Sequence, residues 1–460
     1  MTFSYDKTLG CVETPQGTMT LSKIFLPFFL EMFLMNLMGT VNTFTLSYFS
    51  DNAVAAVGAA SQFVGMLSTF YTLIGTGASI VISHNLGAKN QETASDAVFC
   101  ALTVGGILSL GLSLLMSLLA EPCMRLMHIE GEVFADAVVY FRICMRFSFF
   151  QAMFLVISSV FKSYGRPKIS VCVSLGMNAL NAFLNYLVVF RPIELPLHGV
   201  SGVAWCNVFS RGCSLLVMII LLFRIPMGLN LVGKSLHTLK MIKTILQVGI
   251  PGGISSLSYN ISQVVTTSII AIVGVDAIST KIYVSNLVFY VYVFGMSLGL
   301  STSLLIGYLS GAGRYEQAYR LNLQNLKVTL LLNTTLSVLL FLFGRPLLGL
   351  FTDDPVILRA GSALLFLDIF VEIFRGFNHI EENSLRGAGD VLFPMAVSII
   401  SCWLISVLFS YILGVKLGLG LAGCWIAFSM DEAFRGINYY LRWRSRKWMK
   451  KTLTAKQTGA

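Results

Sequence analysis

Charged residues are scarce in this sequence. Asp, Glu, Lys and Arg make up 12% of its 460 residues, whereas about a quarter of a soluble globular protein is charged. The polar faces that would cover a soluble core are therefore missing from most of the chain. The sequence also contains no Cys-x-x-Cys pair and no histidine cluster, so it offers no pattern typical of a metal or disulfide site. No predicted helix places a His or Cys nucleophile beside a base, and we expect the protein not to be an enzyme.

Long apolar segments recur along the whole chain. Hydrophobic residues make up 55% of the sequence, the mean hydropathy is +0.77, and the segments reach the length of about 20 residues that crosses a bilayer. They lack the alternation of a β-barrel strand, and only helices or closed barrels satisfy the backbone in lipid. The sequence therefore predicts an all-α polytopic membrane protein with twelve transmembrane helices, over residues 21–46, 54–82, 97–119, 134–160, 168–190, 200–223, 241–272, 278–308, 321–343, 357–380, 391–413 and 421–441.

The basic residues gather at the ends of the apolar segments. If the N-terminus lies inside, the outer loops hold only Arg125, Arg191, Lys281, Arg345, Arg359 and Lys416. This asymmetry predicts that both termini are cytoplasmic and that the protein spans the plasma membrane. The formal charge of +10 and the tail "LRWRSRKWMKK" fit anionic lipid headgroups, so we expect contacts with membrane lipids and none with nucleic acid.

The second half of the chain repeats the first. A shift of 224 residues aligns Pro27 with Pro251, Gly75 with Gly299, and "FKSYG" with "LRGAG". No gap is needed over about 150 residues, and the matches include many Gly, Pro and polar positions. The period gives six helices per half, so both halves have the same orientation and form parallel repeats about an axis along the membrane normal. Two such bundles that rock around a central site are typical of a transporter.

The repeat also sets the expected domain boundaries. We place the division between the halves in the glycine-containing basic loop "RIPMGLNLVGKSLHTLK". The expected segments are a cytoplasmic N-terminal segment (1–20), an N-terminal six-helix lobe (21–223), a cytoplasmic loop (224–240), a C-terminal six-helix lobe (241–441) and a basic cytoplasmic tail (442–460).

Several stretches carry a resemblance to a known family. They are "LPFFLEMFLMNLMGTVNTFTLSYFSDNAVAAVG", "VFKSYGRPK", "GIPGGISSLSYNISQ" and "NSLRGAGDVLFP". In order, spacing and duplication, the chain resembles the multidrug and toxic compound extrusion (MATE) transporters over essentially its whole length. The resemblance implies a V-shaped exporter of organic cations, drugs or other amphipathic small molecules. It further implies a monomer that is driven by a proton or sodium gradient and has no cofactor other than that coupling ion.

Ionisable residues within the apolar segments are the first site candidates, because burying a charge in a membrane is costly unless it has a partner or a function. Glu31 lies about two turns into the first predicted helix. The tenth contains "LDIFVEIFRGFN", in which Asp368, Glu372 and Arg375 share one helical face. We expect Glu372 and Arg375 to form a pair, because they are three residues apart.

A second set of candidates consists of amides. Where the family carries acids linked to ion coupling, this sequence has Asn42 in the first helix and Asn185 in the fifth, beside Asn178 and Asn181. An amide cannot cycle a proton, so proton coupling at these positions is not expected. Two interpretations stay open: the oxygens of Asn42, Asn181 and Asn185 form a Na⁺ site or hold substrate, or the amides only hydrogen-bond between helices.

The C-terminal half departs from the family as well. One branch carries a glutamate eight residues after the proline of the seventh helix, where this chain has Tyr259. The matching acid of the tenth helix falls on Arg375. The charges of this half are therefore rearranged.

These residues suggest a mechanism in which a carboxylate binds the coupling cation and substrate is released from a cavity between the lobes. Glu31 and Glu372 are the leading candidates, Arg375 tunes their pKa values, and Asp368 is a reserve. The alternative functions are a lipid-linked oligosaccharide flippase of the same superfamily and, from another class, a channel or receptor.

Overall fold

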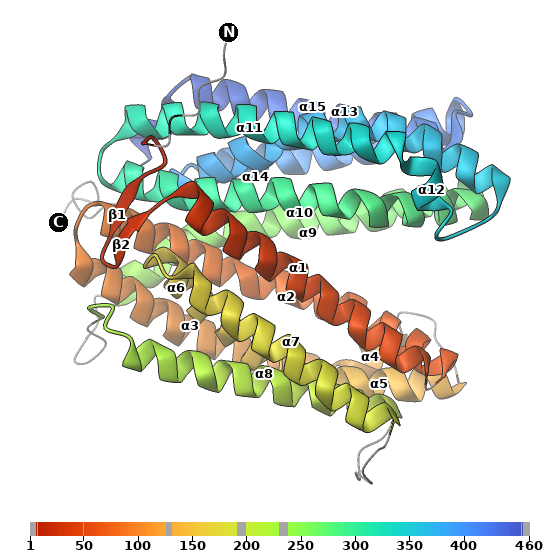
Figure 1. Cartoon of the computed structure of the whole chain (residues 1–460), viewed down its shortest axis with the longest axis horizontal. Coiled ribbons are helices and arrows are strands. Elements are labelled where there is room, and N and C mark those ends of the chain that lie inside the picture. Colours follow the sequence, from red (N-terminus) through yellow and green to blue (C-terminus); the bar gives the residue numbers. More distant parts are fainter. Residues whose placement is uncertain are drawn as a thin grey trace.

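The computed structural model describes residues 6, 8–48, 50–125, 131–190, 199–229, 238–451 and 453. They form two bundles of long helices (Figure 1). A short hairpin of β1 (Val12–Thr14) and β2 (Gly17–Met19) precedes them, with Val12 opposite Met19. The first bundle contains α1 (Leu21–Ser47), α2 (Asp51–Gly87), α3 (Gln91–Leu118), α4 (Ala120–Arg125), α5 (Gly131–Arg146), α6 (Phe149–Ser163), α7 (Pro167–Phe190) and α8 (Gly199–Arg224).

The second bundle follows the same plan. It contains α9 (Thr238–Val273), α10 (Val275–Gly311), α11 (Tyr315–Leu342), α12 (Gly344–Leu348), α13 (Pro355–Gly387), α14 (Leu392–Ser401) and α15 (Gly420–Arg444). Two π-helical segments, Cys402–Val407 and Ser410–Lys416, continue α14, and a short 3₁₀ helix, Lys447–Lys450, follows α15. We refer to the two bundles as the N-terminal lobe and the C-terminal lobe.

The long helices match the twelve that the sequence predicts. Within the described residues, nine helices are long and apolar enough to cross a membrane, and a tenth span results if α5 and α6 count as one. The other two predicted spans correspond to α13 and α15, which hold the buried charges discussed below. Several helices extend beyond their predicted ends, since the predictions followed the apolar runs and the helices include polar turns at their ends. Thus α3 begins at Gln91 and α13 continues to Gly387.

The predicted helix over residues 134–160 is broken. Its two parts, α5 and α6, meet at an angle of 44° on either side of Phe147 and Ser148. Side-chain hydrogen bonds supplement the backbone hydrogen bonds at the break. Ser113 of α3 donates to the backbone oxygen of Met145 (2.5 Å), and the hydroxyls of Ser148 and Tyr71 lie 2.6 Å apart. Such side-chain partners satisfy backbone and hydroxyl groups that lipid cannot.

The lobes touch at one end and separate toward the other (Figure 1). The contacts join α2 to α9 and α10, and α1 to α10. Glycines permit this approach, because a Cβ at Gly87 would lie 2.1 Å from the Tyr308 backbone oxygen and one at Gly311 would lie 2.0 Å from that of His84. The 224-residue shift aligns these two glycines, so the repeat axis passes through this contact.

Both terminal segments add hydrogen bonds at the end of the molecule where the lobes touch. In the N-terminal segment, Gln16 accepts from Arg166 (3.0 Å) of the N-terminal lobe, and the Leu9 backbone oxygen accepts from Gln317 (3.0 Å) of the C-terminal lobe. At the other end of the chain, Leu453 donates its backbone N–H to His84 (3.4 Å).

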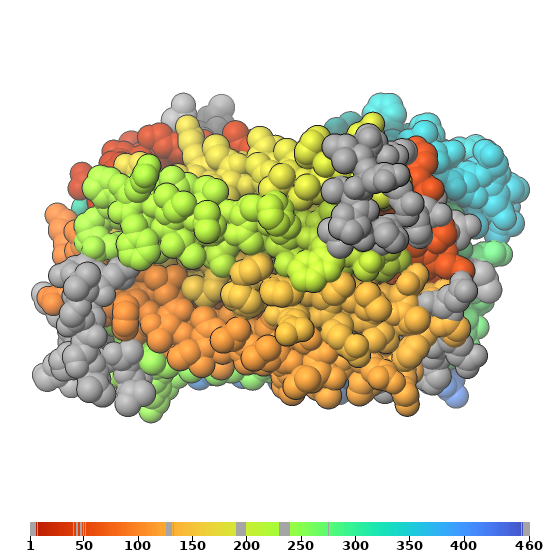
Figure 2. Space-filling model, turned by 90° about the horizontal axis from the view of Figure 1, so that it is seen from below, coloured from red at the N-terminus to blue at the C-terminus, as the bar shows by residue number. Residues whose placement is uncertain are grey.

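The outer faces of the bundles are apolar. Figure 2 shows an outer face of the N-terminal lobe, with α8 beside the helices α5 and α6 that it contacts. Ile107 and Leu118 of α3 are 68% and 81% exposed, and Phe209, Leu216 and Phe223 of α8 are also exposed. Helices present such surfaces to lipid acyl chains.

Candidate functional site

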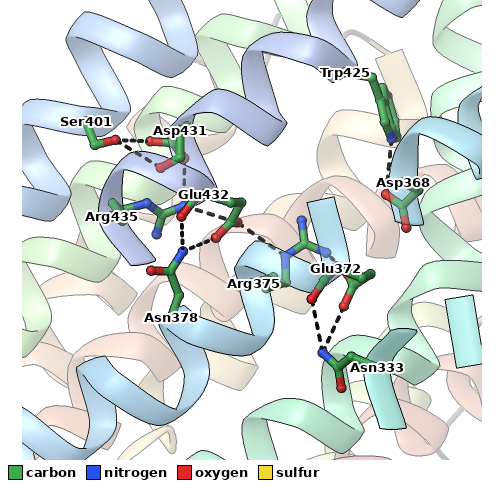
Figure 3. A network of polar contacts seen from close by, with 10 residues as sticks. All are labelled: Asn333, Asp368, Glu372, Arg375, Asn378, Ser401, Trp425, Asp431, Glu432 and Arg435. Carbon is green, nitrogen blue, oxygen red and sulfur yellow. Dashed lines mark hydrogen bonds and ion pairs between the residues drawn. The ribbon is translucent and has the colours of Figure 1, made fainter. Parts of the chain in front are cut away.

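The C-terminal lobe encloses a network of ions between α13 and α15 (Figure 3). Arg375 forms ion pairs with Glu372, one turn before it, and with Glu432 (3.2 Å) of α15. Arg435 binds Asp431 (2.6 Å) and Glu432 (3.1 Å). Glu432 therefore bridges two arginines, and the acids in contact with them are all buried.

Neutral side chains complete the network. Asn378 donates to Glu432, Asn333 donates to Glu372 (3.3 Å), and Ser401 donates to Asp431 (2.6 Å). Each of these bonds satisfies an oxygen of a buried carboxylate. The network thus links α13 and α15 to α11 and to the end of α14.

Asp368 differs from the other acids of this region. It is 4% exposed, and among the described residues its hydrogen-bond partner is the Trp425 indole, which donates to it at 3.1 Å. It makes no ion pair with any Lys or Arg among the residues that the structure describes. Asp368 is consequently a buried carboxylate that lacks a direct ion-pair partner among the described residues.

Two adjoining cavities open onto the network. One, of about 260 Å³, is lined by Asp368, Arg375, Tyr259 and Lys281, among others. The second, of about 330 Å³, shares Tyr259, Arg375 and Glu432 with the first. The tyrosine of α9 also lies against Arg435, whose guanidinium carbon is 5.7 Å from the ring centroid.

The charges of this region do not cancel. Three carboxylates, those of Glu372, Asp431 and Glu432, share the guanidinium groups of Arg375 and Arg435, and Asp368 adds a fourth negative charge. Lys281 adds one positive charge at the cavity wall, where it donates to Thr267. At least one carboxylate is therefore in excess, and a buried excess acid takes up a proton or a metal cation.

The N-terminal lobe contains a neutral counterpart built from amides. The Asn207 oxygen accepts from Asn42 (3.1 Å) and Asn181 (3.0 Å). Asn185 donates to Asn42 (2.7 Å) and to Asn181 (3.1 Å), and Asn207 donates to the Tyr140 hydroxyl (3.3 Å). The amide network thus joins α1, α5, α7 and α8 without a formal charge.

The structure brings together most of the predicted amides but not all of them. Asn178 donates to its own helix, at the Ser174 backbone oxygen (2.8 Å), and lies outside the amide network formed by the described residues. Asn207 and Tyr140 were missed by the sequence reasoning. Asn207 carried the same signal as the others, an amide inside an apolar segment, but it lies in the sixth predicted helix, where no family pattern drew attention to it.

A third polar site lies between the lobes. This interlobe cavity of about 340 Å³ is lined by residues of α1, α2, α6, α9, α10 and α13. Glu31 lines it and is paired with Lys162 of α6 (2.6 Å), while Ser158 donates to the other carboxylate oxygen (3.0 Å). Lys162 was missed because the fourth predicted helix ended at residue 160, which placed this lysine in a loop.

The match to a known protein family falls in two parts, one in each lobe. A family model described as MatE matches residues 27–187 and residues 251–412. The two matches begin 224 residues apart, as the internal repeat does, and together they cover most of the chain.

The chain belongs to the MATE family.

Curated MATE relatives match along the full length. The chain is 36% identical over 447 residues to the uncharacterized transporter YisQ of Bacillus subtilis, and the match covers 97% of this chain and 98% of YisQ. It is 27% identical to the probable multidrug resistance protein NorM of Thermotoga maritima, with 97% and 96% of the two chains covered. The protein is accordingly a multi-pass membrane transporter and not an enzyme.

Solved MATE structures have the same fold. A crystal structure of a MATE protein in complex with MaD3S superposes with a TM-score of 0.86 at 21% identity, covering 94% of this chain and 96% of that one. The predicted fold, twelve helices in two parallel six-helix bundles, is thereby confirmed, and so is the resemblance on which it was partly based.

Proposed function

We propose that this MATE transporter exports amphipathic small molecules from the cell and draws its energy from an inward gradient of H⁺ or Na⁺. The observation that carries the proposal is the excess carboxylate of the C-terminal lobe. A buried acid without a cationic partner is expensive at membrane depth, and such residues mark ion pathways in transporters.

We assign the coupling site to Asp368. Glu372 faces Arg375 and accepts from Asn333, so its charge is balanced in this state. Glu31 is likewise balanced by Lys162. Asp368 has only the Trp425 indole, and it lines a cavity by which an ion can arrive. Binding of a cation at Asp368 changes the charge balance of α13, a helix that also lines the interlobe cavity.

The amide network of the N-terminal lobe fits a structural role better than ion binding. The oxygens of Asn42, Asn181 and Asn207 already accept hydrogen bonds, and only the oxygen of Asn185 has no donor among the described residues. A Na⁺ ion at Asn42, Asn181 and Asn185 would have to share the oxygens of Asn42 and Asn181 with these bonds. We therefore propose that the network joins helices of this lobe.

The interlobe cavity is the proposed substrate site. It draws its lining from both lobes, and its volume of about 340 Å³ lies within the range of pockets for drug-sized ligands. A lipid-linked oligosaccharide is much larger, so the cavity favours a small-molecule exporter over the flippase. If the termini are cytoplasmic, as the distribution of Lys and Arg predicts, the structure is closed to the cytoplasm.

Transport by proteoliposomes tests this function. Purified protein is reconstituted, and accumulation of a fluorescent dye is followed under an imposed pH gradient and then under an imposed Na⁺ gradient. We expect one of the two gradients to drive accumulation, and an ionophore that collapses this gradient to stop it. Dye flux that is as fast without a gradient as with either gradient would instead indicate a channel. Failure of both gradients to drive accumulation would contradict the proposal.

A further inference from the structure

The interlobe cavity carries one cation from each lobe. Lys162 of α6 and Arg386 of α13 both line it. The 224-residue shift aligns them, as the second residues of "FKSYG" and "LRGAG". Their side chains are 13% and 16% exposed, so both cations are largely shielded from bulk water. The pseudo-twofold relation of the lobes therefore places two positive charges at one cavity.

Each cation has one acidic partner, but the two acids come from different helices. In the N-terminal lobe, Glu31 of α1 pairs with Lys162 and accepts from Ser158 of α6. In the C-terminal lobe, the shift aligns Glu31 with Ser255 and Ser158 with Glu382. Glu382 of α13 pairs with Arg386. Acid and serine have thus exchanged places between the lobes, while the cation has kept its position.

The acids are occupied, whereas the cations have hydrogen-bond donors to spare. One Glu31 oxygen accepts from Ser158 and the other lies 2.6 Å from the Lys162 ammonium. Glu382 lines the neighbouring cavity of the C-terminal lobe. An ammonium has three N–H donors and a guanidinium has five, and the Arg386 Nε is buried without an acceptor among the described residues. Among the charged groups of the cavity, the ones that remain available to a ligand are therefore the positively charged donors.

Apolar side chains form much of the remaining wall. Phe28, Met32 and Met35 of α1 line the cavity together with Met296 and Leu300 of α10. Methionine side chains adapt to ligands of different shape. A ligand of this cavity needs an apolar body together with a group that accepts hydrogen bonds from two cations.

We infer that the interlobe cavity binds an amphipathic organic anion whose acidic group lies between Lys162 and Arg386. The inference rests on the proposed function, because it names the substrate class of that exporter. It departs from the organic cations that the family resemblance implies. A carboxylate placed there would accept charge-assisted hydrogen bonds from both lobes at once, and this links occupancy of the cavity to the contact between the lobes.

Binding of two dyes to the purified protein in detergent tests the inference. Fluorescein and tetramethylrhodamine methyl ester share a xanthene ring system, but at neutral pH the first is an anion and the second a cation. Fluorescence anisotropy gives a Kd for each. We expect fluorescein to bind and Lys162→Gln and Arg386→Gln to weaken its binding by about tenfold or more each, because each removes a charge-assisted contact.

Three further variants separate charge from folding. Arg386→Lys keeps the charge and is expected to retain most of the affinity. Arg320→Gln is the matched control, because Arg320 pairs with Glu316 on the exposed surface of α11, and it should leave the Kd unchanged. Glu31→Gln removes the negative charge beside Lys162 with little change of shape. It should tighten fluorescein binding, whereas a site for cations would respond with weaker binding of the rhodamine ester.

The inference would be overturned if the wild type bound the rhodamine ester but not fluorescein, or if neither Lys162→Gln nor Arg386→Gln changed the fluorescein Kd. The assay needs no gradient, so it is separate from the test of transport. Specific fluorescein binding by a protein that accumulates no dye under either gradient would contradict the proposed exporter and support this site. Gradient-driven export of the rhodamine ester alone would support the exporter and overturn this site.

Discussion

The two lobes share a fold and a sequence register, yet their polar centres differ in kind. The N-terminal lobe is joined by the neutral amide network around Asn207, whereas the C-terminal lobe holds the ions around Arg375 and Arg435. The 224-residue shift aligns Glu372 with Ser148 and Arg375 with Gln151. At the same helical positions, one lobe thus carries an ion pair and the other carries neutral side chains.

This difference suits the two lobes to different roles. A network of amides changes neither charge nor hydrogen-bond count when an ion gradient is applied, so it is suited to holding helices together. A network of ions with one excess acid responds to a proton or a metal cation by changing its charge balance. Under the proposed function, two copies of one scaffold have specialised, one for structure and one for coupling.

The largest expected effect comes from breaking the ionic network. Arg435→Met leaves Asp431 without its cation and Glu432 with one cation where it had two. Removing one partner of a buried ion pair costs about 3–5 kcal/mol. We expect a corresponding fall in the free energy of unfolding, measured by thermal denaturation in detergent. Adding Asp431→Asn to Arg435→Met should recover part of the loss. An Arg435→Met variant as stable as the wild type would show that the ion pairs of Arg435 do not stabilise the fold.

A smaller effect is expected when the C-terminal lobe is made to resemble the N-terminal lobe. In a double-mutant cycle, Glu372→Gln and Arg375→Gln should each lower the free energy of unfolding. The double variant should lose less free energy than the sum of the two single losses. Side chains in direct contact couple by about 0.5–3 kcal/mol, and we expect a value in the upper half of this range because the pair is buried. Additive losses would argue against a direct ion pair.

Breaking the amide network should lower the free energy of unfolding by less than breaking the ionic network. Asn207→Leu removes the acceptor of Asn42 and Asn181 and the donor to Tyr140. Leaving buried polar groups without partners costs about 1–3 kcal/mol. The same thermal assay measures the loss, and dye transport per folded molecule should stay dependent on the coupling gradient. A variant that is stable but uncoupled would place ion coupling in this lobe.

The smallest effect is expected at the interlobe cavity. Ser158→Ala removes one hydrogen bond to Glu31 but keeps the ion pair with Lys162. The expected loss of stability is about 1 kcal/mol. Ser255→Ala at the aligned position of the other lobe is the control, because Ser255 bonds to its own helix, at the Pro251 backbone oxygen. Equal losses at the two positions would mean that Ser158 does not act through Glu31.

The sequence was sufficient for the fold because apolar runs, loop charges and an internal repeat are physical consequences of a bilayer and of duplication. It was sufficient for the Glu372–Arg375 contact because three residues separate them on one helix. It could not supply partners from other helices. Glu432 and Arg435 lie in a helix whose packing against α13 has no local signature, and Lys162 and Arg386 lay beyond the predicted helix ends although their side chains line the interlobe cavity.

The most direct test of the account compares two transport modes of Asp368→Asn in proteoliposomes. One is accumulation of dye driven by the coupling gradient, and the other is exchange of dye across the membrane with no gradient. We predict that Asp368→Asn loses the first and keeps the second, because the cavity is intact while the excess carboxylate is gone. Gradient-driven accumulation at the wild-type rate, with the variant normally inserted, would contradict the assignment of coupling to the C-terminal lobe.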